Sequence, residues 1–209
     1  MQHLALLGDS ILDNSPYTAP EPDTADHLQR ALGPNWTVEL FARDGSTMAD
    51  LRFQVSHLPP RSQLGVLSIG GNDAVDHIGI LDEPARGTKD VLARLAAITE
   101  DFRIRYDHVL RDLQPRFERL VVCTIYEPPL ADPLMARLAR VPVSLLNDQI
   151  VRAATAACVD VLDLRAVCRV PTDFVNEIEP SAQGAKKIAA AIAGLLEIPG
   201  RPSVQVFAV

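Results

Sequence analysis

The chain has 209 residues, of which 47% are hydrophobic and 22% are charged, and its formal net charge is −7 at pH 7. These proportions are those of an ordinary globular protein, and they exclude a disordered or collagen-like chain. The acidic balance and the aromatic content of 5% argue against binding of nucleic acid, because that function needs clustered basic residues and aromatic stacking platforms.

The sequence predicts a cytoplasmic protein with no membrane span. Its longest uninterrupted apolar run, from Ile188 to Leu196, has nine residues, whereas a membrane-spanning helix needs roughly 20. The first residues lead directly into a strand-like segment, with no basic region or cleavage site of a signal peptide. The cysteines, Cys123, Cys158 and Cys168, are odd in number and lack CxxC spacing, so they predict neither a disulfide framework nor a zinc site.

Short apolar runs recur along the chain, each followed by a longer segment with helical periodicity. The runs are residues 4–7, 38–41, 64–69, 120–125 and 159–162, and the helical segments are residues 23–32, 46–57, 88–113, 144–157 and 182–196. The runs are rich in β-branched residues and mostly do not alternate with polar residues, which is typical of strands buried on both faces of a parallel sheet.

We therefore expect one α/β domain over residues 1–209, with three α/β/α layers and a five-stranded parallel sheet of flavodoxin-like order. The tail over residues 198–209 fits either an added edge strand or an arm that binds a partner. In open sheets of this kind, ligands bind at the carboxyl ends of the strands. The loops 11–22, 74–90 and 127–143 follow such ends, and we expect them to determine the substrate.

The first candidate functional residue is Ser10, in Gly8-Asp9-Ser10 at the end of the first predicted strand. A serine between a strand and the next loop presents its hydroxyl at the ligand edge, and its own backbone N–H can point to the same place. An acyl-transfer nucleophile requires both groups. The alternative is that Ser10 only caps a turn.

Two further elements could complete an acyl-transfer site. The third predicted strand ends in Gly70-Gly71-Asn72-Asp73, where glycines allow a ligand to approach closely and Asn72 offers a neutral amide donor. Such a donor, aimed at a developing oxyanion, contributes roughly 3–4 kcal/mol to catalysis. Gly45, in the Asp-Gly turn after the second predicted strand, could add a backbone N–H. Each element alone is also explained by a turn.

Taken together, in this order and at these strand ends, the three elements resemble the SGNH (GDSL-like) hydrolase family over nearly the whole chain. Gly8-Asp9-Ser10 matches the nucleophile block, Gly45 the glycine block and residues 70–73 the G-x-N-D block. Members of this family are three-layer α/β/α hydrolases of esters and related acyl groups. The resemblance implies that Ser10 is the nucleophile, and that the oxyanion hole consists of the N–H groups of Ser10 and Gly45 and the side chain of Asn72.

The last block of the family is altered in this chain. The family pattern is D-x-x-H-P, followed by a helix with a glycine five residues after the histidine. Pro180 and Gly184 fit that pattern, but Glu179 stands at the histidine position and Asn176 at the aspartate position. A frame that begins at Asp173 would place Asn176 at the histidine position and would lose the proline and glycine matches, so we reject it.

Three explanations of the missing histidine remain open. The chain can be a non-catalytic binding protein that keeps the fold. Alternatively, Glu179 accepts the proton of Ser10, and Asn176 orients it through a hydrogen bond without adding the like charge of an aspartate. As a third explanation, His77, five residues after Asn72 in the loop at the same sheet edge, takes over the role of the base.

The sequence therefore predicts a serine hydrolase that acts on a small-molecule ester or acyl substrate, with Ser10 as nucleophile and a base of non-standard kind. The alternative is a non-catalytic protein of the same fold that binds an acyl or carbohydrate-like ligand. We expect no nucleotide cofactor, because no P-loop or G-x-G-x-x-G motif is present. We also expect no metal, although several aspartates near the strand ends could suggest one: Asp9, Asp13, Asp44 and Asp73.

Overall fold

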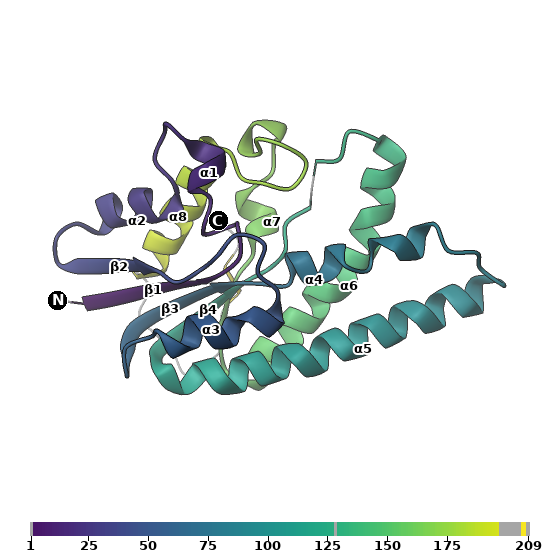
Figure 1. Ribbon diagram of the computed structural model, residues 1–209, viewed down its shortest axis with the longest axis horizontal. Coiled ribbons are helices and arrows are strands. Elements are labelled where there is room, and N and C mark those ends of the chain that lie inside the picture. Colours follow the sequence, from purple (N-terminus) through teal and green to yellow (C-terminus); the bar gives the residue numbers. More distant parts are fainter. Residues whose placement is uncertain (1, 128, 197–205, 208–209) are drawn as a thin grey trace.

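The strands of the protein form one parallel sheet (Figure 1). In the computed structural model, which describes residues 2–127, 129–196 and 206–207, the strands are β1 (Gln2–Gly8), β2 (Trp36–Leu40), β3 (Ser62–Ser68), β4 (Phe117–Cys123), β5 (Asp160–Leu162) and β6 (Val206–Phe207). Their order is β2-β1-β3-β4-β5-β6. The first five follow the predicted flavodoxin-like order, so the predicted fold class is confirmed.

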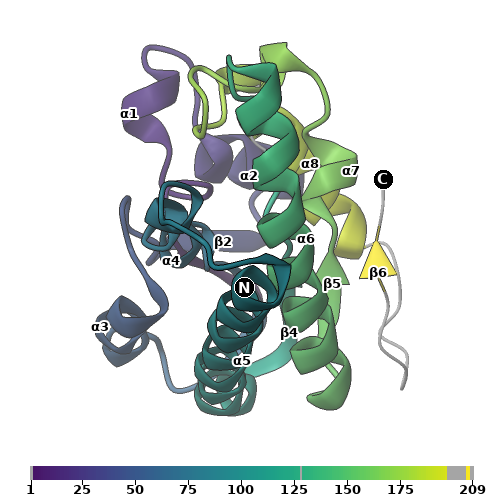
Figure 2. The ribbon, with the colours of Figure 1, turned by 90° about the vertical axis from the view of Figure 1, so that its right-hand side faces the viewer.

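The sixth strand answers part of the question about the tail. Val206 pairs with Val161 of β5 in parallel, and Figure 2 shows β6 at the edge of the sheet beside β5. Residues 206–207 thus form an edge strand, which was one of the two predicted alternatives. The rest of the predicted tail, residues 198–205 and 208–209, lies outside the described residues.

Helices cover both faces of the sheet (Figures 1 and 2). One layer contains α2 (Thr24–Leu32), α7 (Leu164–Val167) and α8 (Ala182–Leu196), and the other contains α3 (Leu51–Ser56), α5 (Thr88–Leu113) and α6 (Pro133–Ala156). Shorter elements connect them: α1 (Ser15–Thr18), α4 (Gly71–Val75), η1 (Met48–Asp50), η2 (Ile78–Leu81), η3 (Gln114–Arg116) and η4 (Pro171–Asp173).

Alternation along β1 explains why its sequence is apolar throughout. Leu4 and Leu6 pack into the core beneath α2 and α8, whereas Ala5 and Leu7 pack into the core beneath α5 and α6. All four side chains are fully buried. A strand with a helical layer on each face has no solvent-facing side, and a run of apolar residues is the expected sequence.

One predicted helix is longer than expected. The sequence predicts a helix from residue 144, after a loop over residues 127–143, but α6 begins at Pro133 and contains Pro142. Asp132 caps its first turn by accepting hydrogen bonds from the N–H groups of Leu134 and Met135, and proline is favourable in the first turn. Pro142 removes one helical hydrogen bond without ending the helix, and the predicted helix begins only after it.

Two buried amide side chains fix the carboxyl ends of the strands. Gln54 of α3 accepts a hydrogen bond from the Gly8 N–H and donates one to the Gly8 carbonyl, each at 2.8 Å. Asn147 of α6 binds both backbone groups of Ile125 in the same manner, at 2.8 and 2.7 Å. Gly8 has a φ of +121°, and a Cβ atom there would lie 1.7 Å from the Ser68 carbonyl oxygen, so only glycine allows β1 to end against β3.

No helix within residues 2–127 and 129–196 combines the length and the hydropathy that are needed to cross a bilayer.

Candidate active site

Ser10 lies directly after β1, at the carboxyl edge of the sheet and beside the point where the strand order reverses between β1 and β3. The turn that contains it is closed by the N–H groups of Leu12 and Asp13, which donate to the Asp9 carbonyl at 3.1 and 3.0 Å. Among the described residues, the backbone N–H of Ser10 has no hydrogen-bond acceptor. This N–H group is therefore free to bind a substrate oxygen.

Asn72 lies in the first turn of α4, at the end of the neighbouring strand β3, and it lines the same cavity as Ser10. Its Nδ2 atom donates a hydrogen bond to the Ser46 carbonyl oxygen at 2.9 Å. A side-chain amide has two N–H groups, so this bond orients the amide and leaves a second donor for a ligand. The structure thus brings together the predicted nucleophile and the predicted amide donor.

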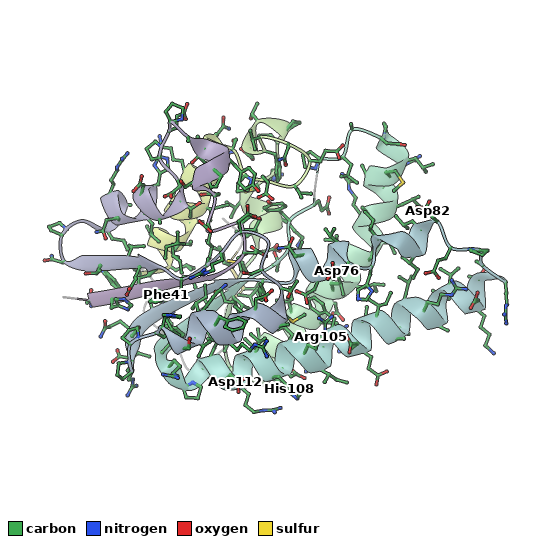
Figure 3. The ribbon with its side chains drawn as sticks, in the orientation of Figure 1. Phe41, Asp76, Asp82, Arg105, His108 and Asp112 are labelled. Carbon is green, nitrogen blue, oxygen red and sulfur yellow. The ribbon has the colours of Figure 1, made fainter. Side chains whose placement is uncertain are left out.

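Asp73 ties the α4 segment to two other parts of the chain. Its Oδ2 atom accepts a hydrogen bond from the Met48 N–H at 3.0 Å, and its Oδ1 atom lies 2.6 Å from a guanidinium nitrogen of Arg105, on α5 (Figure 3). Burial raises the pKa of Asp73, although both donors oppose that shift. Arg105 was not singled out by the sequence analysis, because a basic residue in a long helix carries no local sign of such a partner.

Gly45 lies at the surface, with a φ of +76°. It faces a separate hollow beside the site, which it shares with Arg43, Ser46 and Gln54, and it does not line the cavity that contains Ser10. The structure therefore gives no contact between Gly45 and Ser10. Its role in an oxyanion hole stays a prediction.

Glu179 is 6% exposed and lines the same cavity as Ser10. Burial raises the pKa of its carboxyl group above the usual range, a hydrogen bond with the Ser10 side chain lowers it, and the charge of Asp44 raises it further. Its Oε2 atom is buried and has no hydrogen-bond partner among the described residues. A carboxylate in this environment binds a proton more readily than one in water.

The turn that holds Glu179 is built by Asn176. The Oδ1 atom of Asn176 accepts hydrogen bonds from the N–H groups of Ile178 and Glu179 at 2.9 and 2.8 Å. The sequence analysis predicts that Asn176 binds the Glu179 carboxylate. The structure describes bonds of the Asn176 amide oxygen only, so the contact of its amide nitrogen with the carboxylate stays a prediction.

Other backbone contacts fix the rest of the loop. The Tyr126 hydroxyl donates a hydrogen bond to the Ile178 carbonyl oxygen, and the Val175 N–H donates one to the Glu179 carbonyl oxygen at 3.0 Å. After the loop, Gly184 passes so close to Asp173 that an added Cβ atom would lie 2.1 Å from the Asp173 carbonyl oxygen. The glycine that the sequence analysis matched to the family pattern therefore permits α8 to pack against the segment that carries Glu179.

Asp9 adds a second buried carboxyl group to the cavity. Burial raises its pKa to about 8; the Ile11 N–H opposes this shift, and the charge of Glu179 adds to it. Asp9 is therefore mostly protonated at neutral pH. In the sequence, Asp9 stands out as part of the nucleophile motif and as one of the aspartates that could suggest a metal, but nothing in the tripeptide indicates that its carboxyl group is removed from water.

The cavity that connects these groups has a volume of about 180 Å³. Apart from the polar groups described above, its walls are mainly apolar and come from α4, η2, the end of β4, and the amino-terminal halves of α5 and α6. They include Ile80, Leu95, Ile98, Ile125, Pro142 and Leu146. The cavity could not be predicted from the sequence, because its walls come from segments far apart in the chain.

Comparison with known proteins agrees with this geometry. Residues 6–187 match the model of the GDSL-like Lipase/Acylhydrolase family. The chain belongs to this family. No curated protein matches the sequence.

Solved structures show the same fold as this GDSL-like chain. A phospholipase A1 from Streptomyces albidoflavus NA297 has a TM-score of 0.67 and 16% identity, with 94% of this chain and 99% of that chain covered. A lipolytic protein of the G-D-S-L family from Veillonella parvula DSM 2008 has a TM-score of 0.68 and 12% identity, with 95% and 100% covered. An acetyl xylan esterase from Geobacillus stearothermophilus has a TM-score of 0.61 and 17% identity, with 96% and 97% covered. At these identities the likeness shows the fold alone.

The family assignment confirms the resemblance seen in the sequence and indicates acyl-ester hydrolysis as the general class of reaction. It leaves open which group replaces the histidine in this GDSL-like chain. His77 also lines the cavity, but the structure describes no hydrogen bond of its side chain. In the described part of the chain, no three His, Cys, Asp or Glu residues are placed to hold a metal ion.

Proposed function

We propose that this GDSL-like protein hydrolyses carboxylic esters, with Ser10 as nucleophile and Glu179 as general base. The observation that carries the proposal is that Ser10 and the buried Glu179 carboxyl group line the same cavity, where the Ser10 side chain also lowers the pKa of Glu179. In a serine hydrolase of the usual kind a histidine occupies the position of Glu179. Here the cavity that contains Ser10 holds the Glu179 carboxyl group at that position of the family pattern.

The reaction would begin when Glu179 takes the hydroxyl proton of Ser10 while Oγ attacks the ester carbonyl carbon. The carbonyl oxygen becomes an oxyanion, which the N–H of Ser10 and the free N–H of Asn72 stabilise; a third donor from Gly45 belongs to the prediction from the sequence. The protonated Glu179 then gives its proton to the leaving alcohol, and an acyl group remains on Ser10. Water, deprotonated by the same carboxylate, releases the acid and restores the hydroxyl.

Burial of Glu179 compensates in part for the missing imidazole. A free Glu has a pKa of about 4.3 and a free His of about 6.5, so an unperturbed carboxylate is a weaker base by about 3 kcal/mol. Desolvation raises the pKa of Glu179 and narrows this gap. Asp9 does not add to this rise, because its pKa of about 8 keeps it neutral at pH 7 and it then places no like charge beside Glu179.

Asn176 acts as a positioning residue in this proposal. It lies at the surface, and its bonds to the backbone of the turn hold Glu179 in place. The apolar cavity walls would receive the apolar part of the ester. The substrate class that we propose is therefore an ester with an apolar acyl or alcohol group.

Reaction with a fluorophosphonate probe tests the nucleophile. We expect the protein to become covalently labelled, the Ser10→Ala variant to stay unlabelled, and the Glu179→Gln variant to react much more slowly. Labelling that persists in Ser10→Ala would refute the assignment of the nucleophile. If the wild type is inert both to the probe and toward p-nitrophenyl butyrate, the non-catalytic binding protein becomes the better description.

The two candidate bases are separated by a second pair of variants. His77→Ala should keep the activity, since the structure shows no contact between His77 and Ser10, whereas Glu179→Gln should lose it because an amide cannot accept a proton. The opposite result would assign the role of base to His77.

A further inference from the structure

The cavity opens through an exposed apolar surface. Val75, Ile78 and Leu145 line the cavity and are also exposed to solvent, to between 38% and 53%. Val75 lies at the end of α4, Ile78 begins η2, and Leu145 lies on α6. Part of the rim of the cavity is thus apolar, like its interior.

Three more apolar side chains extend this rim along α6. Leu134, Leu138 and Val141 are exposed to between 41% and 55%, and none of them lines the cavity. Together with Leu145 they are spaced by four, three and four residues, so they lie on one face of the helix. We call the whole surface the apolar collar: Val75, Ile78, Leu134, Leu138, Val141 and Leu145.

The collar lies on a part of the molecule that extends beyond the sheet. The amino-terminal parts of α5 and α6 extend beyond the carboxyl edge of the sheet, with α4 and η2 between them (Figure 1). Contiguous apolar surface on a water-exposed protein usually marks an interaction site, because isolated exposed leucines are common but a continuous group of them is not.

Charged residues of both signs border the collar. On α6, Arg137 and Arg140 are exposed, and Arg140 lies 2.9 Å from Glu127. On the opposite side of the mouth, Asp76 and Asp82 follow α4 and η2 (Figure 3). An apolar stripe beside arginines is typical of helices that lie in the interface of a bilayer, and charges of both signs suit headgroups that carry a phosphate and an ammonium group.

We propose that the apolar collar binds the surface of a phospholipid bilayer with zwitterionic headgroups. The continuity of the collar with the cavity favours this occupant over a second copy of the chain. A second copy seated on the collar would close the mouth of the cavity, whereas a bilayer would present apolar chains directly to it. This inference goes beyond the proposed reaction, because binding requires neither Ser10 nor Glu179.

Flotation with phosphatidylcholine vesicles tests the proposal. The Ser10→Ala variant serves as the starting protein, so that binding is measured without hydrolysis. We expect it to float with the vesicles, and we expect Leu138→Asp and Val141→Asp, each added to it, to reduce the bound fraction at least tenfold. The matched control is Ile104→Asp on α5, where an isoleucine of similar exposure, 52%, lies outside the collar; its binding should be unchanged.

To show that these variants fold, each substitution is also made in the protein that keeps Ser10, and hydrolysis of a short water-soluble ester is measured. Since Leu138 and Val141 do not line the cavity, both aspartate variants should keep that activity even though they no longer bind vesicles. Should the whole protein be inactive, the flotation result still stands by itself, and circular dichroism then verifies the fold.

Three results would overturn the proposal. The first is absence of flotation by the Ser10→Ala protein. The second is an equal loss of binding in Ile104→Asp, which would mean that any added negative charge prevents binding. The third is a stable dimer in light scattering that Leu138→Asp dissociates, which would identify a second copy of the chain as the occupant of the collar.

Discussion

Asp173 and Glu179 are both buried carboxyl groups, six residues apart in the segment before α8, yet their surroundings differ. Burial would raise the pKa of Asp173, but a 2.6 Å contact with the Lys187 ammonium group and hydrogen bonds from the N–H groups of Arg169 and Val170 outweigh it, so the pKa is lowered. For the Glu179 carboxyl group, a hydrogen bond with the Ser10 side chain opposes the effect of burial, but burial prevails and the pKa is raised.

The difference separates a carboxylate that holds the structure together from one that is suited to proton transfer. At Asp173 the donors stabilise the charged form, and the charge in turn joins the loop to α8. At Glu179 the Ser10 side chain stabilises the charged form less than burial destabilises it, and the higher proton affinity that results is a property expected of a general base. The two positions should therefore respond in opposite ways to removal of the charge.

The largest expected effect is on activity at Glu179. The Glu179→Gln substitution should lower kcat for p-nitrophenyl butyrate by about 10²–10⁴-fold, which is the usual contribution of a general base. Its free energy of unfolding in urea should stay equal or rise, because a neutral amide is buried more easily than a charge. Full activity in this variant would contradict the role of Glu179.

The second expected effect is on activity at Asn72, a neutral side chain that, unlike the two carboxyl groups, would stabilise the transition state directly. Asn72→Ala should lower kcat by about 10²–10³-fold with little change in KM, because it removes one oxyanion donor. Steady-state kinetics on the same ester measures both constants. A change confined to KM would show that Asn72 only binds the substrate or shapes its loop.

Removal of the charge at Asp173, unlike that at Glu179, is expected to lower the stability of the protein. Asp173→Ala removes the acceptor of a buried ion pair and leaves two backbone N–H groups unpaired, which should cost about 3 kcal/mol of unfolding free energy. Urea titration measures this cost, with Glu179→Gln as the matched control at the other end of the segment. Equal stability of the two variants would remove the distinction between them.

The last prediction concerns the pH dependence of stability, through Asp9. Its pKa rises from 3.8 to about 8 on folding, so the native state holds the proton more tightly and stability falls as pH rises through that interval, by at most about 1.4 kcal/mol for each pH unit. Asp173 acts in the other direction: its lowered pKa stabilises the fold above the ordinary range of Asp and is lost as pH falls through its native value.

The Asp9→Asn variant isolates the contribution of Asp9 to the pH dependence of stability. Urea titrations between pH 4 and 8 should show that Asp9→Asn loses less stability with rising pH than the wild type does. An unchanged slope would mean that Asp9 titrates in the folded protein as it does in water.

Much of the fold and part of the site could be predicted from the sequence, because both depend on local patterns. The apolar runs located the first five strands, and the residues that follow two of them, Ser10 and Asn72, do line one cavity. The part of α6 before residue 144 could not be predicted, since a proline such as Pro142 favours the end of a helix and the packing of α6 on α5 is not visible in the sequence.

What the sequence could not provide is burial. The raised pKa of Asp9 and the apolar walls of the cavity result from distant segments that exclude water from the site. The bond between Asn176 and the backbone depends on the exact path of a turn. The cytoplasmic location expected from the sequence stays a prediction.

The side chains of Gln54 and Asn147 bind backbone groups of Gly8 and Ile125 at the ends of β1 and β4. These bonds bear on which part of the site unfolds locally most easily. Exchange of these amide hydrogens with deuterium requires the bonds to the buried side chains of Gln54 and Asn147 to break. The loop of Glu179 is held by contacts of another kind: the turn of Asn176, the hydrogen bond from the Tyr126 hydroxyl and the bridge between Phe174 and Pro180. Since residues 175–178 are exposed, we expect their amide hydrogens to exchange faster than those of Gly8 and Ile125, so that the segment that carries the base opens more often than the strand end that carries the nucleophile.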